Sequence, residues 1–259
     1  MPGFESWPWG LVVAIVAIML LSGFMQGALG LGFPTVATPL IALFTDMRSA
    51  VILVLLPCLA TVAINVFRGG GLRPVLARFW MMPFYMLLGA SVGTRLFIAF
   101  PDFPYALLLS ALIFVYLNLD RLGRTHWPLF ARHRFAFGAL FGFVAGVTEG
   151  SANVAAPALI IYYLGIGLPP IMLVQAMNIC FLAGKSTQFA TLATTGGVPL
   201  VQWAVTLPLA VIAAAGTLYG IGVRNRIEAA TYRRWLKLAL FAMALMLAVQ
   251  YAWKAYAGW

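Results

Sequence analysis

The sequence has 259 residues, of which 63% are hydrophobic and only 8% are charged. Ordinary soluble domains carry roughly 25% charged residues, so this composition excludes a water-soluble fold and predicts a single transmembrane domain spanning residues 1–259. The net charge of +10 does not indicate nucleic-acid binding, because the basic residues lie in short loops between apolar runs, where membrane topology explains them. Cys58 and Cys180 both lie inside apolar segments. Neither a disulfide, a metal site nor a cofactor is therefore expected.

Hydropathy predicts an all-α polytopic membrane protein with about eight transmembrane segments. Glu5 and the absence of Lys or Arg before the first apolar run argue against a cleaved signal peptide, so the first segment should be retained. In chain order the expected segments are 9–45 (interrupted), 48–67, 79–99, 103–118, 135–164 (interrupted), 170–192, 199–221 and 234–253.

An internal repeat organises these segments. The pattern Gly-Phe-x-x-Gly followed by Pro occurs over 23–39 and again over 142–157, and Gly-x-x-x-Gly occurs at 89–93 and 216–220. Glycines four residues apart also allow close helix packing, so these pairs have an alternative explanation as packing seams. The pattern predicts two four-segment repeats, over about 9–118 and 135–253.

The basic residues predict how the repeats are oriented. Most of them lie in three loops, at 68–78, 121–134 and 224–237. The positive-inside rule places all three loops on the cytoplasmic side. If each segment crosses the membrane once, the third loop lies on the side opposite the first two. If segment 135–164 instead enters and leaves the membrane on the same side, all three loops lie on the cytoplasmic side. The loops after the second and sixth segments then face opposite sides, so we expect an inverted repeat.

Each repeat opens with a broken or re-entrant helix. The stretches 23–34 and 142–153 are rich in Gly or Pro, which interrupt helical hydrogen bonding. Free amides in a bilayer are tolerated where they face protein, water or ligand, so we expect a buried cavity; kinks needed only for packing are the alternative. The half-helices that follow, 35–45 and 154–164, would direct partly positive N–H groups at an anion.

Two ionisable residues lie deep within predicted segments, Glu149 and Lys185. A charge at the bilayer centre costs about 3 kcal/mol or more, so such residues normally face a cavity or a partner. An ion pair is expected, with either a structural or a functional role. In the functional interpretation Lys185 attracts an anion, and protonation of Glu149 frees the lysine and couples transport to a proton.

Polar and glycine residues on the same segments are the candidate lining of the substrate site, although each polar side chain has an alternative role as a contact between helices. Arg48 and Arg95 lie near segment ends and are interpreted as interfacial. With Lys185, the substrate-binding candidates are Gln26, Gly30, Gly32, Asn65, Gly150, Ser151, Asn153, Asn178 and Gln188; Gln175 is a further polar side chain on the same segments that could contribute to the lining.

Three stretches carry a family resemblance. GFMQGALGLGFPTVATPLIALF (23–44), its echo GFVAGVTEGSANVAAPALIIYYLG (142–165) and NICFLAGKSTQ (178–188) resemble the TauE/SafE sulfite-exporter family of bacterial membrane proteins. The resemblance extends over essentially the whole chain. It implies a multi-pass permease of the inner membrane for a small anion, such as sulfite, sulfoacetate or a related organosulfonate or C2 compound. Residues 148–151 depart from the small, apolar glycine run of many relatives.

Two other classes of function are weighed against a secondary transporter. An intramembrane enzyme is disfavoured, because the sequence contains neither an HExxH metal motif nor a GxSxG nucleophile motif. An anion channel is the closer alternative, since broken helices also line pores. The expected Glu149–Lys185 pair favours a coupled carrier.

Overall fold

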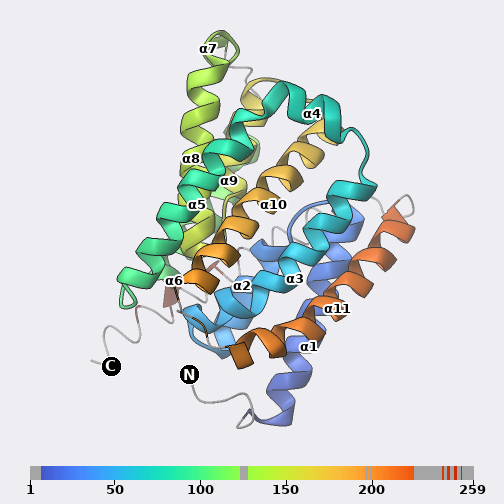
Figure 1. Cartoon of the computed structure of the whole chain (residues 1–259), viewed down its shortest axis with the longest axis vertical. Coiled ribbons are helices and arrows are strands. Elements are labelled where there is room, and N and C mark those ends of the chain that lie inside the picture. The colour runs from blue at the N-terminus through green and yellow to red at the C-terminus, as the bar shows by residue number, and fades with distance from the viewer. Residues whose placement is uncertain are drawn as a thin grey trace.

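A computed structural model describes residues 7–122, 128–195, 198 and 200–224, together with residues 241, 244, 245, 248, 249 and 252. Within these residues every regular element is a helix (Figure 1). The helices are α1 (Trp9–Leu29), α2 (Phe33–Phe44), α3 (Met47–Arg68), α4 (Leu72–Phe79), α5 (Met81–Ala99), α6 (Tyr105–Leu122), α7 (Pro128–Arg132), α8 (Arg134–Ala152), α9 (Ala156–Gly165), α10 (Pro170–Thr194) and α11 (Leu200–Val223).

The long helices have the length and composition of membrane spans. Five described helices are long and apolar enough to cross a bilayer, namely α1, α3, α5, α8 and most of α11. Large apolar side chains such as Val13, Leu140 and Val211 are more than half exposed on the outside, where lipid rather than water is the favourable surrounding. The first seven expected segments all contain helices, but the eighth, 234–253, lies mostly outside the described residues. The arrangement in two four-segment repeats therefore stays a prediction.

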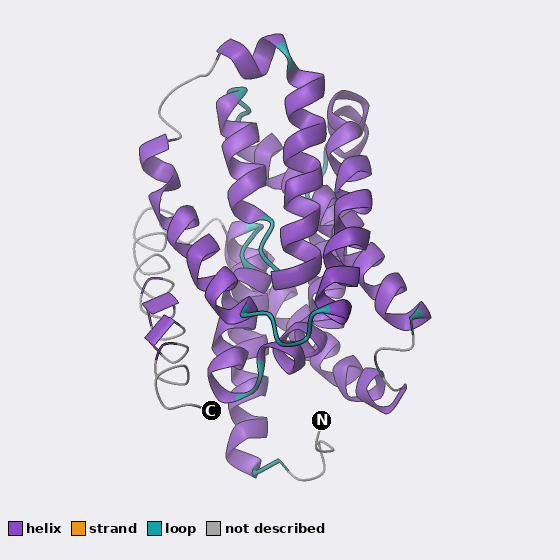
Figure 2. Cartoon of the chain, turned by 90° about the vertical axis from the view of Figure 1, so that its left-hand side faces the viewer, coloured by secondary structure: helices purple, strands orange, loops and turns teal. Residues whose placement is uncertain are grey.

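The first segment of each predicted repeat is broken at one short point. α1 ends at Leu29, and Gly30 and Gly32 have φ values of 78° and 114° before α2 begins. α8 ends at Ala152, and Asn153 has a φ of 59° before α9 begins. These left-handed conformations end a helix and favour glycine or asparagine. Loops lie half-way along the molecule as well as at its ends (Figure 2).

The expectation that the interruption begins at the first glycines of each block is wrong, because these glycines lie inside helices and form packing seams. A Cβ on Gly23 would lie 2.2 Å from the carbonyl oxygen of Ala213 on α11. A Cβ on Gly142 would lie 2.8 Å from the carbonyl oxygen of Met82, and one on Gly146 only 2.4 Å from that of Met86. Only glycine allows backbones to approach so closely. Gly142 of α8 lies against Met82 of α5, and Gly146 lies against Met86. Residue numbers therefore increase in the same direction along both helices, so α8 runs parallel to α5.

The stretch from α8 to α9 leaves one end of the molecule and returns to it. The Tyr162 hydroxyl, near the end of α9, donates to the carbonyl oxygen of Arg134 at the start of α8 at 2.9 Å. Gly165, the last residue of α9, lies against the Phe130 ring of α7. α9 therefore folds back beside the start of α8, and the two helices form a hairpin that begins and ends on the same side of the molecule, which agrees with the re-entrant segment that the charge distribution predicts.

The described basic loops gather at that same end. Gln175 near the start of α10 donates to the carbonyl oxygen of Val66 near the end of α3 at 2.9 Å. Arg224, just after α11, donates to the carbonyl oxygen of Ala28 near the end of α1 at 3.2 Å. Gly30, just after α1, also lies against Val174 near the start of α10, and the short α4 connects the end of α3 to the start of α5, which runs beside α8. The ends of α1, α3 and α11 and the starts of α5, α8 and α10 thus share one side, which we call the basic end.

Candidate functional site

A buried ion pair lies beside the break between α8 and α9. Lys185 Nζ on α10 is 2.9 Å from Glu149 Oε1 on α8, and both side chains are 0% exposed. The ammonium also donates to Asn153 Oδ1 at 2.6 Å and to Gln188 Oε1 at 2.8 Å. Three oxygen acceptors thus match its three donors. The expected ion pair forms, and its polar atoms contact one another directly.

The second carboxylate oxygen of Glu149 caps the start of α9. Glu149 Oε2 accepts the backbone N–H of Ala155, the residue that precedes α9, at 3.0 Å. The start of a helix presents unpaired N–H groups and a partial positive charge. The carboxylate of Glu149 is consequently bound from one side by an ammonium and from the other by a helix N-terminus, which are two groups that recognise oxyanions.

Amide side chains complete the surroundings of the pair. Gln188 Nε2 donates to the carbonyl oxygen of Gly150 at 3.1 Å and to Asn153 Oδ1 at 3.1 Å. Asn153 Nδ2 donates to Thr38 Oγ1 on α2 at 3.3 Å, which links the second break to the helix that follows the first break. These side chains hold the ion pair between α2, α8 and α10.

A second polar network of neutral amide side chains surrounds the break between α1 and α2, and the Arg224 guanidinium lies beside Gly30 at its edge. Gln26 Oε1 accepts the backbone N–H of Phe33, the first residue of α2, at 3.0 Å. Gln26 Nε2 donates to Asn178 Oδ1 at 2.8 Å, and Asn178 Nδ2 donates to the carbonyl oxygen of Gly30 at 2.5 Å. Asn65 Nδ2 donates to the carbonyl oxygen of Gln26 at 2.9 Å.

The two breaks are built alike around different side chains. Gln26 and Glu149 each lie four residues before the left-handed residue, and each side chain accepts an N–H at the start of the next half-helix. The backbone carbonyl of each also accepts from an amide, on α3 or on α10. The same position therefore holds a neutral amide at the first break and a carboxylate with a lysine partner at the second.

Other predicted residues have local roles. Gly32 precedes α2, and a Cβ there would meet nothing within 4 Å. Gly150 packs against Ala90 of α5 and presents its carbonyl to Gln188. The Ser151 hydroxyl donates to Val147 on its own helix at 2.7 Å, so it takes no part in the contacts of the ion pair.

The sequence argument missed two neighbours of the pair. Thr38 bonds Asn153, and the buried Cys58 thiol of α3 lies within electrostatic range of Glu149 and Lys185. Neither residue has a motif that would single it out. Within the described residues no group of three or more His, Cys, Asp or Glu side chains is placed to hold a metal ion.

Comparison with known proteins identifies one relationship. The family model described as "Sulfite exporter TauE/SafE" matches residues 15–247, which include all the residues of both breaks. No curated protein matches the chain. No solved structure matches it either.

Proposed function

The chain belongs to the TauE/SafE sulfite-exporter family, and on that premise we propose that it is a secondary transporter for a small anion in the bacterial inner membrane. The substrate we propose is sulfite or a small organosulfonate or other C2 organic anion. The multi-pass helical fold and the exposed apolar surface agree with a membrane transporter. Loops with Arg68, Arg134 and Arg224 at the basic end favour a cytoplasmic location for that end.

One observation carries the proposal: the Glu149 carboxylate lies between the Lys185 ammonium and the Ala155 N–H at the start of α9. A sulfite or sulfonate group has the same requirements as a carboxylate, namely a cation and directed N–H donors. Glu149 therefore occupies the place of the substrate anion. Such a site exchanges its internal carboxylate for the transported oxyanion.

Charge balance then favours coupling to a proton. With Glu149 ionised, the pair is neutral; if an anion replaced the ionised carboxylate, a buried site would hold two negative groups and one positive group. Protonation of Glu149 as the anion binds keeps the site neutral, because Lys185 then pairs with the substrate instead. Since burial of unbalanced charge is costly, one proton should accompany one singly charged anion. The buried Cys58 thiol of α3 is a titratable group that interacts electrostatically with both members of the pair.

In the described conformation the pair is closed to solvent. Both charged side chains are 0% exposed, so exchange requires movement of the helices around them. Re-entrant half-helices at a repeat interface are a common place for such movement in secondary transporters. An inverted two-repeat architecture would provide alternating access, with the break at Gly30 and the break at Asn153 lying in opposite repeats.

Reconstitution in liposomes tests the proposal. Purified protein should give saturable flux of radiolabelled sulfite or sulfoacetate that a proton gradient drives, with sulfate as a comparison anion. We expect Lys185→Ala to abolish flux, because the anion loses its cation. Glu149→Gln should abolish the dependence on the proton gradient, because the amide cannot take up a proton.

Matched controls separate a local effect from a general loss of charge. Arg95→Ala and Asp102→Asn remove a cation and an acid from exposed positions, and both should transport at the wild-type rate. Wild-type flux and wild-type gradient dependence in both site variants would contradict the assigned roles. Ohmic conductance without saturation would assign the chain to the channels.

A further inference from the structure

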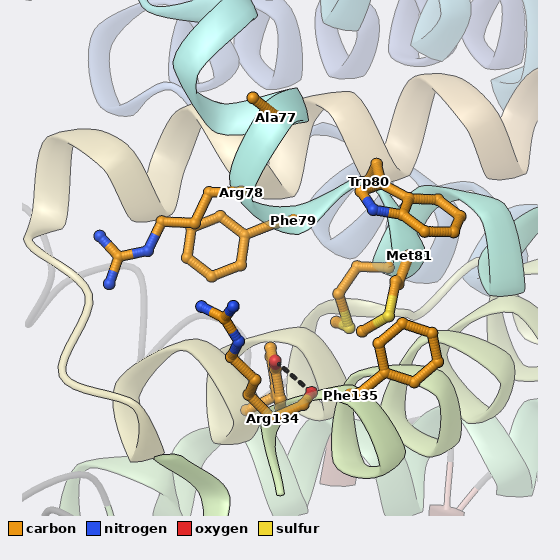
Figure 3. Close-up of a pocket in the computed structure, with 9 residues that line it drawn as sticks. Ala77, Arg78, Phe79, Trp80, Met81, Arg134 and Phe135 are labelled. Atoms are coloured by element: carbon orange, nitrogen blue, oxygen red, sulfur yellow. Dashed lines mark hydrogen bonds between the residues drawn. The ribbon is translucent and has the colours of Figure 1, made fainter. Parts of the chain in front are cut away.

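A cleft separate from the ion pair opens at the basic end of the molecule. It has a volume of about 110 Å³ and lies between the junction of α4 and α5 and the start of α8 (Figure 3). Its floor contains the buried side chains of Phe79, Met82 and Tyr162. The polar and aromatic side chains at its mouth come both from the α4–α5 junction and from the start of α8.

The cleft has a cationic part and an aromatic part. The guanidinium groups of Arg78 and Arg134 lie together on one side, whereas Trp80, Met81 and Phe135 lie on the other (Figure 3). No acidic residue lines the cleft, and across the described part of the chain no carboxylate is within salt-bridge distance of either arginine. The described residues therefore leave the two positive charges uncompensated.

One helix dipole adds to this positive potential. α8 begins at Arg134, so its N-terminus, with a partial positive charge, lies at the cleft. α5 begins at Met81 directly after α4 ends at Phe79, so the partial charges of these two helix ends offset each other. The site is thus suited to an anion through its two arginines and the N-terminus of α8.

The aromatic part continues onto the outer surface of the helices. Trp80, Phe84 and Phe135 are 53%, 47% and 57% exposed. Their rings touch in sequence, with centroids 6.2 Å apart for Trp80 and Phe84 and 6.4 Å apart for Trp80 and Phe135. Exposed Trp beside Arg at a helix end is typical of the headgroup level of a bilayer. An anion held at Arg78 and Arg134 would therefore lie next to a surface suited to hydrocarbon.

We propose that this cleft binds an anionic phospholipid of the adjacent leaflet. Its phosphate lies between Arg78 and Arg134, and the first part of its acyl chains lies against Trp80, Phe84 and Phe135. Cationic clefts between transmembrane helices on the cytoplasmic side are suited to acidic headgroups. A free anion would use only the cationic part of the cleft, whereas a phospholipid uses both parts.

Native mass spectrometry of the intact protein tests this site. The protein is equilibrated in mixed micelles with phosphatidylglycerol or phosphatidylcholine of the same chain length, and the bound lipid is counted. We expect preferential retention of phosphatidylglycerol and a loss of that retention, on the order of tenfold, in the double variant Arg78→Gln/Arg134→Gln. Arg73→Gln removes an exposed arginine from the same helix outside the cleft, and it should retain the lipid like the wild type.

Two further measurements make the result decisive. Trp80→Ala should weaken retention of phosphatidylglycerol, because the acyl chains lose their aromatic contact. Inorganic phosphate is then added as a competitor. Equal retention in the double variant, no preference over phosphatidylcholine, or displacement of the lipid by millimolar phosphate would overturn the proposal; the last result would assign the cleft to a soluble anion.

Discussion

Removal of Lys185 alone should destabilise the protein far more than removal of the whole ion pair. In Lys185→Met the Glu149 carboxylate keeps its bond from Ala155 N–H but loses the ammonium, and the oxygens of Asn153 and Gln188 lose the same donor. Breaking a buried pair by removing one partner costs roughly 3–5 kcal/mol, because an uncompensated charge stays buried. We expect a loss of about this size in the free energy of unfolding.

The double variant Glu149→Gln/Lys185→Met should recover most of that loss. It buries no charge, and the amide oxygen introduced in place of the carboxylate can still accept the Ala155 N–H. Replacement of a complete buried pair by neutral residues is often neutral in stability, so the loss in the double variant should be clearly smaller than the sum of the two single losses, and the double-mutant cycle should give a favourable coupling energy of at least about 3 kcal/mol. The double variant should nevertheless fail to transport, which separates stability from function.

Unfolding in mixed micelles by titration with dodecyl sulfate, followed by far-UV circular dichroism, measures these differences at neutral pH. Arg95→Met, at an exposed position, is the matched control and should cost little. The reasoning is refuted if Lys185→Met costs no more than Arg95→Met, or if the two single effects simply add in the double variant.

Two further predictions concern packing and topology. Gly93→Leu should abolish the yield of monodisperse protein in size-exclusion chromatography, because even a Cβ would lie 2.2 Å from the Val147 carbonyl oxygen. Gly10→Leu, where a Cβ meets nothing within 4 Å, should leave the yield unchanged, and equal yields would contradict close packing of α5 and α8. In a background without native cysteines, Arg73→Cys should react with an impermeant thiol reagent only in inside-out vesicles, and Asp102→Cys only in intact spheroplasts. Labelling of both positions from one side would contradict the assigned direction of α5.

The sequence predicted the positions of the helices well because hydrophobic runs and their ends are local features. α3 was expected over 48–67 and extends from Met47 to Arg68. Asp46 caps its start by accepting the Ser49 N–H at 2.9 Å. The basic Arg68 is its last residue, and three glycines follow it. Length, cap and stop signal all lie within one short window, so no long-range information was needed.

The extent of the breaks could not be predicted in the same way. Gly23 and Gly27 resemble helix breakers in the sequence, yet their place is set by backbone carbonyls of Ala213 and Thr217 nearly two hundred residues away. A glycine that permits close packing and a glycine that ends a helix have the same side chain, and only the partner distinguishes them. Gly30 differs because its positive φ ends α1.

The site was predictable in its charges and not in its neutral members. Glu149 and Lys185 were found because an ion deep in a membrane segment must have a partner. Thr38 and Cys58 are ordinary residues of apolar helices, and only the packing of α2 and α3 brings them to the pair. The free-energy cost of burying a charge in a membrane segment allows charged site residues to be identified from the sequence alone. Contacts between neutral side chains can be identified only from the three-dimensional structure.

The difference between the two breaks decides where the proposed transport mechanism places anion exchange. At the first break Gln26 supplies an uncharged oxygen to Phe33 N–H and is itself held by Asn178, so α2 has a permanent cap whose strength does not change with pH. At the second break the cap is a carboxylate, and its hold on α9 depends on its charge and on Lys185. In the mechanism we propose, a proton taken up by Glu149 weakens only the second cap and frees an ammonium and a helix N-terminus together. One fixed break and one exchangeable break would then be sufficient for a carrier, because the bond between Thr38 and Asn153 gives the second break a fixed neighbour.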